Sequence, residues 1–202
     1  VAAELADLAG ATLEAALAIA RSEVGEAAAT CRLAVIAMGK CGGHELNYIS
    51  DVDVLFVAEP VDGVEEIEAV QSATRLAQTL MCACVTPTAE GTVWEVDPNL
   101  RPEGKQGALV RTLASYDGYY QRWASTWEFQ ALLKARPAAG DLDLGARFVE
   151  LVTPMVWSAA DRPNFVEDVQ AMRRRVEQNV PVKDADRQLK LGTKYAQDKW
   201  PG

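Results

Sequence analysis

Two apolar runs, separated by a glycine-rich polar segment, dominate the first third of the sequence. Residues 33–38 and 52–57 have the length and the branched side chains that are typical of buried strands. The segment between them opens with a glycine-rich turn at 39–43. Because side chains alternate along a strand, Asp51 and Asp53 at the entry to the second strand point to the same face. The pattern therefore predicts a strand–turn–strand unit with two carboxylates at its edge.

Helical periodicity flanks this unit. Apolar residues recur at helical spacing over residues 2–21, and we expect this amphipathic helix to cover one face of a sheet. Residues 64–84 show spacings of three and four and predict a second helix. A third strand is expected at residues 92–97, where Asp97 ends the strand as the first two aspartates begin theirs. A polar loop at 99–107 follows.

From Thr112 onward the pattern is helical. The first helix of this part carries an aromatic flank, which at helical spacing is typical of core packing. The aromatic residues of this flank are Tyr116, Tyr119, Tyr120, Trp123 and Trp127. Glu128 lies among apolar residues, and we expect it to pair with Lys134 or Arg136, because a buried carboxylate needs a partner.

Two more helices are predicted after a turn. Residues 137–141 predict a turn that ends in a helix N-cap, and a helix follows directly. The next helix is expected at residues 164–179, after an N-cap at Asp161 and with Pro163 in its first turn.

The composition of the 202 residues is that of an ordinary soluble globular protein, with 49% hydrophobic and 24% charged residues. The formal net charge of −9 argues against broad binding to nucleic acid or to an anionic membrane. No apolar stretch is long enough to span a bilayer. The four cysteines lack zinc-ligand spacing and His44 is the only histidine, so a Cys/His metal site is not expected. Reduced thiols in a cytoplasmic protein are the simplest interpretation.

The neighbouring aspartates 51 and 53 repel each other unless a cation lies between them. Carboxylate oxygens suit a hard ion, and Mg²⁺ characteristically binds one or two carboxylates together with substrate phosphates. The glycines just upstream allow a backbone to approach phosphate oxygens closely and to offer N–H groups to them. Two solvated loop carboxylates are the simpler alternative. The apolar strand, the Gly-Gly turn and Ser50 beside the pair favour a metal–phosphate site instead.

The polar loop contributes two basic residues, Arg101 and Lys105. Either they compensate the charge of the carboxylates, or they hold the non-bridging oxygens of a phosphate, the arginine in a bidentate manner. The pattern leaves both roles open.

Three motifs in fixed order are highly specific. They are GGHELNYISDVD at 42–53, VDPNLRPEG at 96–104 and WEFQALLKAR at 127–136. With these motifs the chain resembles the glutamine synthetase adenylyltransferase family over residues 33–192. Members of that family attach AMP to a tyrosine of glutamine synthetase and remove it again. The resemblance implies an α+β fold of the polymerase-beta-like nucleotidyltransferase type, a mixed sheet flanked by helices and followed by a helical subdomain.

The resemblance also implies roles for individual residues. Asp51, Asp53 and Asp97 match the three metal-binding aspartates of the family, which hold two Mg²⁺ ions for an in-line displacement at phosphorus. The phosphate-binding candidates are Gly42, Gly43, Ser50, Arg101 and Lys105. The expected partners are glutamine synthetase, ATP, ADP, phosphate and the PII signal protein, with no nucleic acid and no membrane.

Complete members of the family carry two such domains in tandem, so the chain is expected to hold one of them. The implied parts are a nucleotidyltransferase domain at 1–111 and a helical subdomain at 112–192. Residues 154–157 and 170–178 resemble the amino-terminal copy, in which phosphate attacks the tyrosyl-AMP bond and ADP is released. The alternative is the carboxy-terminal copy, in which the tyrosine hydroxyl attacks ATP and pyrophosphate leaves.

The chain departs from the family after Gly192. A glycine-rich segment continues the family pattern there, whereas residues 193–202 lack periodicity and are expected to form a poorly ordered tail. This departure supports a second alternative, a truncated and non-catalytic module that docks on glutamine synthetase or on PII. The intact aspartates argue for catalysis. A nucleic-acid polymerase relative fits the carboxylates but not the net charge of −9.

Overall fold

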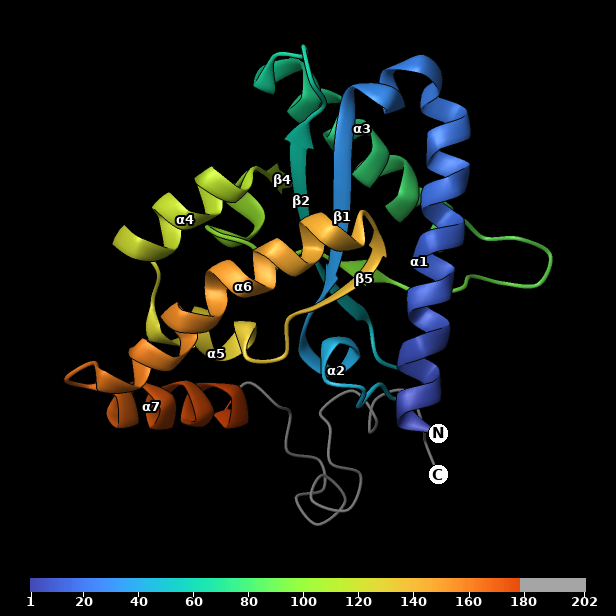
Figure 1. The fold of residues 1–202 in the computed structure, drawn as a ribbon. Helices are drawn as coiled ribbons and strands as arrows, with labels where there is room; N and C mark the ends of the chain where they lie inside the picture. Colours follow the sequence, from blue (N-terminus) through green and yellow to red (C-terminus); the bar gives the residue numbers. More distant parts are fainter. Residues whose placement is uncertain (179–202) are drawn as a thin grey trace.

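The computed structural model describes residues 1–178 and shows an α+β fold built on one mixed sheet (Figure 1). The strand order is β3-β2-β1-β5, and β4 also pairs with β2. β1 runs antiparallel to β2 and to β5, whereas β3 and β4 run parallel to β2. The strands are β1 (Cys31–Ala37), β2 (Val52–Pro60), β3 (Val96–Asp97), β4 (Val110–Arg111) and β5 (Arg136–Gly140).

Helices cover both faces of this sheet. On one face α1 and α3 lie side by side, and on the other lie α4, α5 and α6 (Figure 1). The helices are α1 (Ala2–Val24), α2 (Gly39–Gly42), α3 (Glu66–Val85), α4 (Leu113–Arg122), α5 (Thr126–Leu132), α6 (Leu142–Ser158) and α7 (Phe165–Gln178). Short 3₁₀ turns lie at η1 (Gly25–Thr30), η2 (Gly104–Gln106) and η3 (Ala159–Asp161).

The two covered faces explain why the first two strands read as continuous apolar runs. Alternate residues of β1 and β2 enter two separate cores, so that Val35 and Phe56 pack with α1 and α3. Ile36 and Leu55 pack on the opposite side with α4, α5 and α6. A strand that is buried on both faces has no polar side, and the prediction of two buried strands is confirmed.

The predicted third strand is wrong over most of its length. We expected a strand over 92–97, but within this range only Val96 and Asp97 pair with β2. The backbone N–H groups of Val93 and Trp94 donate to the carbonyl of Cys84 at 3.2 and 3.4 Å. These residues therefore complete the C-terminus of α3 and cannot extend the ladder.

The predicted turn at 137–141 is also wrong, because Arg136–Gly140 form the edge strand β5 against β1. Pro137 has no N–H to donate, and an edge strand with a register shift beside it tolerates that loss. This strand follows residue 111, so the sheet uses residues from both sides of the predicted domain boundary. The predicted N-cap is confirmed, since the Asp141 side chain accepts the Leu144 N–H.

The helix that was expected from Thr112 onward is divided in two. The predicted start is confirmed, with Thr112 as the N-cap of α4, but this helix ends at Arg122 and α5 begins at Thr126. The buried Glu128 carboxylate accepts the Ser125 N–H at 2.8 Å, within a capping box of α5. The expected lysine or arginine partner of Glu128 is thus replaced by the backbone of its own helix.

The remaining sequence predictions have mixed outcomes. The helix expected at 164–179 begins at Phe165, so Pro163 precedes it and does not lie in its first turn. All four cysteines are free, as predicted. Among the described helices none has the length and apolarity needed to cross a bilayer. The predicted tail at 193–202 lies outside the described residues.

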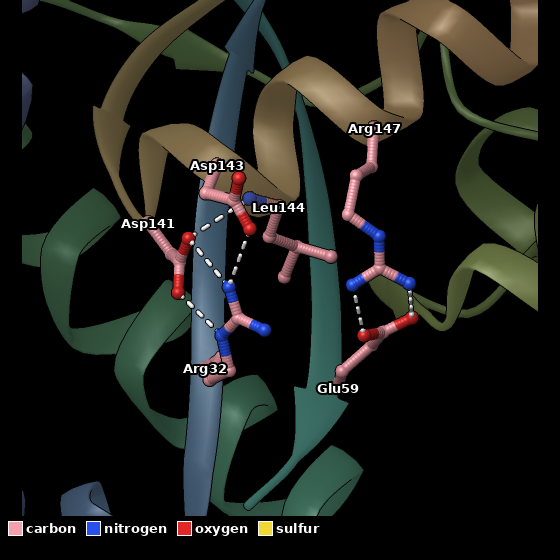
Figure 2. Close-up of polar contacts among 6 residues, drawn as sticks. All are labelled: Arg32, Glu59, Asp141, Asp143, Leu144 and Arg147. Atoms are coloured by element: carbon pink, nitrogen blue, oxygen red, sulfur yellow. Dashed lines mark hydrogen bonds and ion pairs between the residues drawn. The ribbon is translucent and has the colours of Figure 1, made fainter.

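Two ion-paired arginines attach α6 to the central strands (Figure 2). Arg32 on β1 donates from Nε to Asp141 at 2.6 Å and from Nη2 to Asp143 at 3.1 Å. Arg147 on α6 donates to both carboxylate oxygens of Glu59 on β2, at 2.7 and 3.2 Å. Asp141 has a second function, because its Oδ1 accepts the Leu144 N–H at 2.8 Å.

We expect Asp141→Ala to lower the free energy of unfolding by about 1–2 kcal/mol, because it removes a helix cap and an ion pair together. Asp143→Ala, which removes an ion pair at a side chain that is 78% exposed, is the control and should stay within about 0.5 kcal/mol. Denaturant unfolding measures the free energy of unfolding of both variants.

The Arg32 guanidinium and the Leu144 N–H hold the pKa of Asp141 below its usual value. Its stabilising effect is therefore lost as the pH falls through that lowered pKa. Equal losses in both variants would contradict the capping role.

Candidate metal centre

Three carboxylates meet at one edge of the sheet. Asp51 immediately precedes β2, Asp53 lies within it, and Asp97 ends β3. One oxygen from each lies within 4.8 Å of the others, and all three side chains are half-buried. The structure therefore brings the three predicted aspartates together, although most of the strand that carries Asp97 was wrongly predicted.

The register of two parallel strands brings the cluster together. Asp53 lies opposite Asp97 in the β2–β3 pairing, and the Val52 N–H donates to the Glu95 carbonyl at 2.8 Å. Side-chain alternation then puts Asp51 on the same side as Asp53. A short strand is sufficient, because a single pair of residues in register determines the spacing of the carboxylates.

The electrostatics of the cluster favour a bound cation. Burial, together with the smaller effects of the Asp51 and Asp97 charges, raises the pKa of Asp53 to about 6, and the positive charge of Lys40 opposes this shift. The ionised cluster is therefore unfavourable by itself. Three oxygen donors within reach of one point are the ligand set of a hard divalent ion. The residues present thus fit such a metal.

Lys40 is a site residue that sequence reasoning did not identify. Its half-buried ammonium interacts with Asp51 and Asp53, and burial is the main cause that lowers the pKa of Lys40. The available signal was a lysine inside the glycine-rich turn at 39–43, upstream of the two aspartates. A positive charge at this position partly balances the carboxylates.

The glycine-rich turn packs directly against the cluster. Gly39 adopts a positive φ of 51°, and a Cβ on it would overlap the Asp53 carboxylate. Gly42 has no room for a side chain, because the carbonyls of Lys134 and Ala37 lie against it. The turn forms the short helix α2, and the Met38 N–H before it donates to the Asp53 carbonyl at 2.8 Å.

The end of the third sequence motif, at the start of β5, contacts this turn. Arg136 donates from Nη2 to the Cys41 carbonyl at 3.2 Å and from Nε to the Gly42 carbonyl at 3.4 Å. Lys134 covers Gly43 and pairs with Glu45 at 2.5 Å. The resemblance motifs at 42–53 and 127–136 are therefore in contact, which their separation in sequence did not reveal.

The remaining candidates occupy different environments. Ser50 is buried next to the first aspartate. Arg101 is buried within its own loop, where its guanidinium donates to three backbone carbonyls. Lys105 is exposed on the same loop. Phosphate binding by these three residues, and by Gly42 and Gly43, stays a prediction.

The fold and this cluster together define an α+β protein with a candidate divalent-metal centre at the edge of a mixed sheet. The family model described as glutamate-ammonia ligase adenylyltransferase matches residues 1–151. The chain belongs to this family.

Curated relatives agree with the family assignment. A relative from Streptomyces avermitilis is 66% identical over 191 residues, covering 95% of this chain and 19% of the relative. Relatives from Streptomyces coelicolor and Cutibacterium acnes are 64% and 55% identical, each over 95% of this chain and over 19% and 20% of their own lengths. All three are named bifunctional glutamine synthetase adenylyltransferase/adenylyl-removing enzyme. The chain spans about a fifth of their length.

In the metal-free protein we expect Asp53→Asn to raise the melting temperature at pH 7 and to change it little near pH 4. A carboxyl with a folded-state pKa of about 6, against an ordinary value of 3.8, binds its proton more tightly when folded. Stability therefore falls as the pH rises from about 4 to about 6, and the substitution abolishes that fall.

Thermal unfolding in chelator across this pH range measures the effect. Asp62→Asn, at an exposed turn position, is the matched control. A pH-independent difference between Asp53→Asn and the unsubstituted chain would show that burial and the neighbouring carboxylates do not raise the pKa of Asp53 as described.

Proposed function

We propose that the chain catalyses metal-dependent nucleotidyl transfer on glutamine synthetase. The observation that carries this proposal is the cluster of three carboxylates on the parallel strands β2 and β3. The family assignment and the names of the relatives supply the substrate class. We further propose that the sheet and its helices are of the polymerase-beta-like nucleotidyltransferase type.

Each site residue has a defined chemical part in this proposal. Asp51, Asp53 and Asp97 would hold Mg²⁺, with two ions expected. When bound, Mg²⁺ neutralises charge on phosphoryl oxygens and lowers the pKa of an attacking oxygen. Lys40 carries a positive charge next to the same carboxylates, where it would bind a phosphate oxygen.

The reaction we favour is phosphorolytic removal of AMP. An oxygen of phosphate forms a bond to the phosphorus of AMP while the bond from that phosphorus to the tyrosine oxygen breaks. The proton that phosphate loses is balanced by the one that the tyrosine oxygen gains, and ADP leaves. The support for this direction is the sequence likeness of residues 154–157 and 170–178 to the removing copy. The opposite reaction, adenylylation from ATP, uses the same carboxylates and remains the second candidate.

Two further parts of the proposal rest on the resemblance and on chemistry. Binding of the PII signal protein follows from the resemblance alone. The cytoplasm is the proposed compartment, because four free thiols suit a reducing environment.

The direct test supplies adenylylated glutamine synthetase, Mg²⁺ and orthophosphate with this chain as the only catalyst. We expect ADP to form in a phosphate-dependent manner. AMP transfer from ATP to unmodified glutamine synthetase, without ADP formation, would reassign the chain to the adenylylating reaction. Silence in both assays, with retained binding to glutamine synthetase, would favour a docking module.

We expect Asp53→Asn to reduce turnover by roughly 10³-fold or more, equivalent to about 4 kcal/mol of transition-state stabilisation. The loss follows from removing a ligand oxygen from the centre of the cluster. Steady-state kinetics at saturating Mg²⁺ measures it, with Asp62→Asn again as the control. Unchanged Mg²⁺-dependent turnover would exclude this metal centre from the reaction.

Lys40→Gln should lower kcat/KM by about tenfold to a hundredfold, because a charge-assisted contact to phosphate is lost. Lys40→Arg retains the charge and should recover part of the activity. Arg75→Gln removes a positive charge from an exposed position on α3 and serves as the control. Equal activity of all three variants would remove Lys40 from the proposed mechanism.

A further inference from the structure

The loop that follows Asp97 is built around a buried arginine. Arg101 is only 8% exposed, and each of its guanidinium nitrogens donates to a backbone carbonyl of the loop. The acceptors are the carbonyls of Pro98 at 2.9 Å, Gly107 at 3.2 Å and Lys105 at 3.3 Å. A planar guanidinium can reach three divergent acceptors at once, which a lysine ammonium cannot do in the same geometry.

The backbone of this loop is closely fitted around the arginine. Glu103 and Gly104 both have positive φ angles, 63° and 56°, which produce a tight reversal. Gly107 has no space for a Cβ, because the Pro102 carbonyl and the Glu103 side chain lie against it. Holding a non-glycine residue such as Glu103 in the left-handed region requires compensating contacts, and the Arg101 guanidinium holds the chain on both sides of Glu103 through its three carbonyl acceptors.

The loop is attached to the metal centre at its first residues. The Asp97 carboxylate accepts the Asn99 N–H through Oδ1 at 2.7 Å, and the Arg101 N–H donates to the Pro98 carbonyl at 3.2 Å. Arg101 thus binds Pro98 through both its backbone and its side chain. The orientation of the Asp97 carboxylate depends on the Asn99 N–H, and the position of that N–H depends on this arginine-held turn.

The far end of the loop is attached to the sheet as well. Arg111 on β4 pairs with Glu103 at 2.5 Å and donates to Ser115 at 3.2 Å. The loop begins after β3 and ends before β4, and both of these strands pair with β2, the strand that carries Asp53. Both ends are therefore fixed relative to the carboxylate cluster.

We propose that Arg101 is a positioning residue that sets the third metal ligand, and that it does not bind phosphate. Its guanidinium holds the loop in the conformation that presents the Asn99 N–H to Asp97. This inference rests on the proposed metal centre. The phosphate contact that the sequence predicted for Arg101 is thereby replaced by an indirect role, in which Arg101 orients Asp97 through the backbone of the loop.

The two roles make opposite predictions for a variant that keeps the charge. If Arg101 contacts phosphate, Arg101→Lys retains a cation and raises mainly the KM for phosphate. If Arg101 positions Asp97, lysine loses two of the three carbonyl contacts and metal binding weakens. Gly107→Ala gives an independent test, because it changes no charge and disturbs the same loop sterically.

The experiment measures Mn²⁺ binding to the whole chain by electron paramagnetic resonance, which needs no catalytic turnover. We expect Arg101→Lys and Gly107→Ala each to raise the Mn²⁺ dissociation constant by about tenfold, the usual effect of losing an outer-shell partner. Arg122→Gln, which removes an arginine from an exposed position on α4, should bind Mn²⁺ as the unsubstituted chain does. Circular dichroism of each variant confirms that the chain is folded.

Kinetics adds a second readout. For both loop variants we expect excess Mg²⁺ to restore most of kcat while the KM for phosphate stays within twofold. Unchanged Mn²⁺ binding in both folded loop variants, or a raised phosphate KM that Mg²⁺ does not correct, would overturn the positioning role. If Arg101→Lys does not fold, Gly107→Ala decides by itself.

Asp97→Asn separates this inference from the function on which it rests. If the unsubstituted chain binds no Mn²⁺, the metal centre and the positioning role both fail. If it binds Mn²⁺ and Asp97→Asn weakens the binding while the loop variants do not, only the positioning role fails.

Discussion

The repulsion among three carboxylates is the constraint on which the rest of this structure depends. Separate aspartates would move apart into water, but these three are fixed by strand pairing and by the turn that packs against Asp53. The sheet supplies the rigidity, because β1 and β2 are buried on both faces. Lys40 offsets part of the negative charge, and a divalent ion would offset more. The protein thus uses folding free energy to maintain a site of high negative potential.

The core of the fold could be predicted because its signal is local. Continuous apolar runs identified β1 and β2, and helical periodicity identified α1 and α3. The errors occur where a distant partner decides the local structure. The backbone at Val93 completes α3, and a Pro- and Gly-containing segment becomes strand because the edge of β1 is free to pair with it. Neither the C-terminus of α3 nor the edge of β1 is visible in the segment itself.

The site divides in the same way. Asp51 and Asp53 could be identified from their spacing, and Asp97 from its motif, and the structure brings all three together. Lys40 was missed because its one signal, a lysine within a glycine-rich turn, does not show that the turn packs against the aspartates. Arg101 was assigned by its charge alone, and its burial under backbone carbonyls depends on a loop conformation that no periodicity reports. Charge indicates which residues can bind phosphate, but only geometry shows which of them are available.

The pairing of β3 and β4 with the same side of β2 has a consequence for tolerance to insertion and deletion. Asp97 pairs with Asp53 and Val110 pairs with Phe56, so the two anchor points are three residue steps along β2, about 10 Å, apart. The distance between the two ends of the loop that joins β3 to β4 is therefore set by β2 and not by the length of the loop. Residues added near Lys105 would leave these two anchors in place, but they would displace the Lys105 and Gly107 carbonyls to which Arg101 donates. The insertion or deletion of one residue between Asp51 and Asp53 would shift every following side chain of β2 to the opposite face of the sheet.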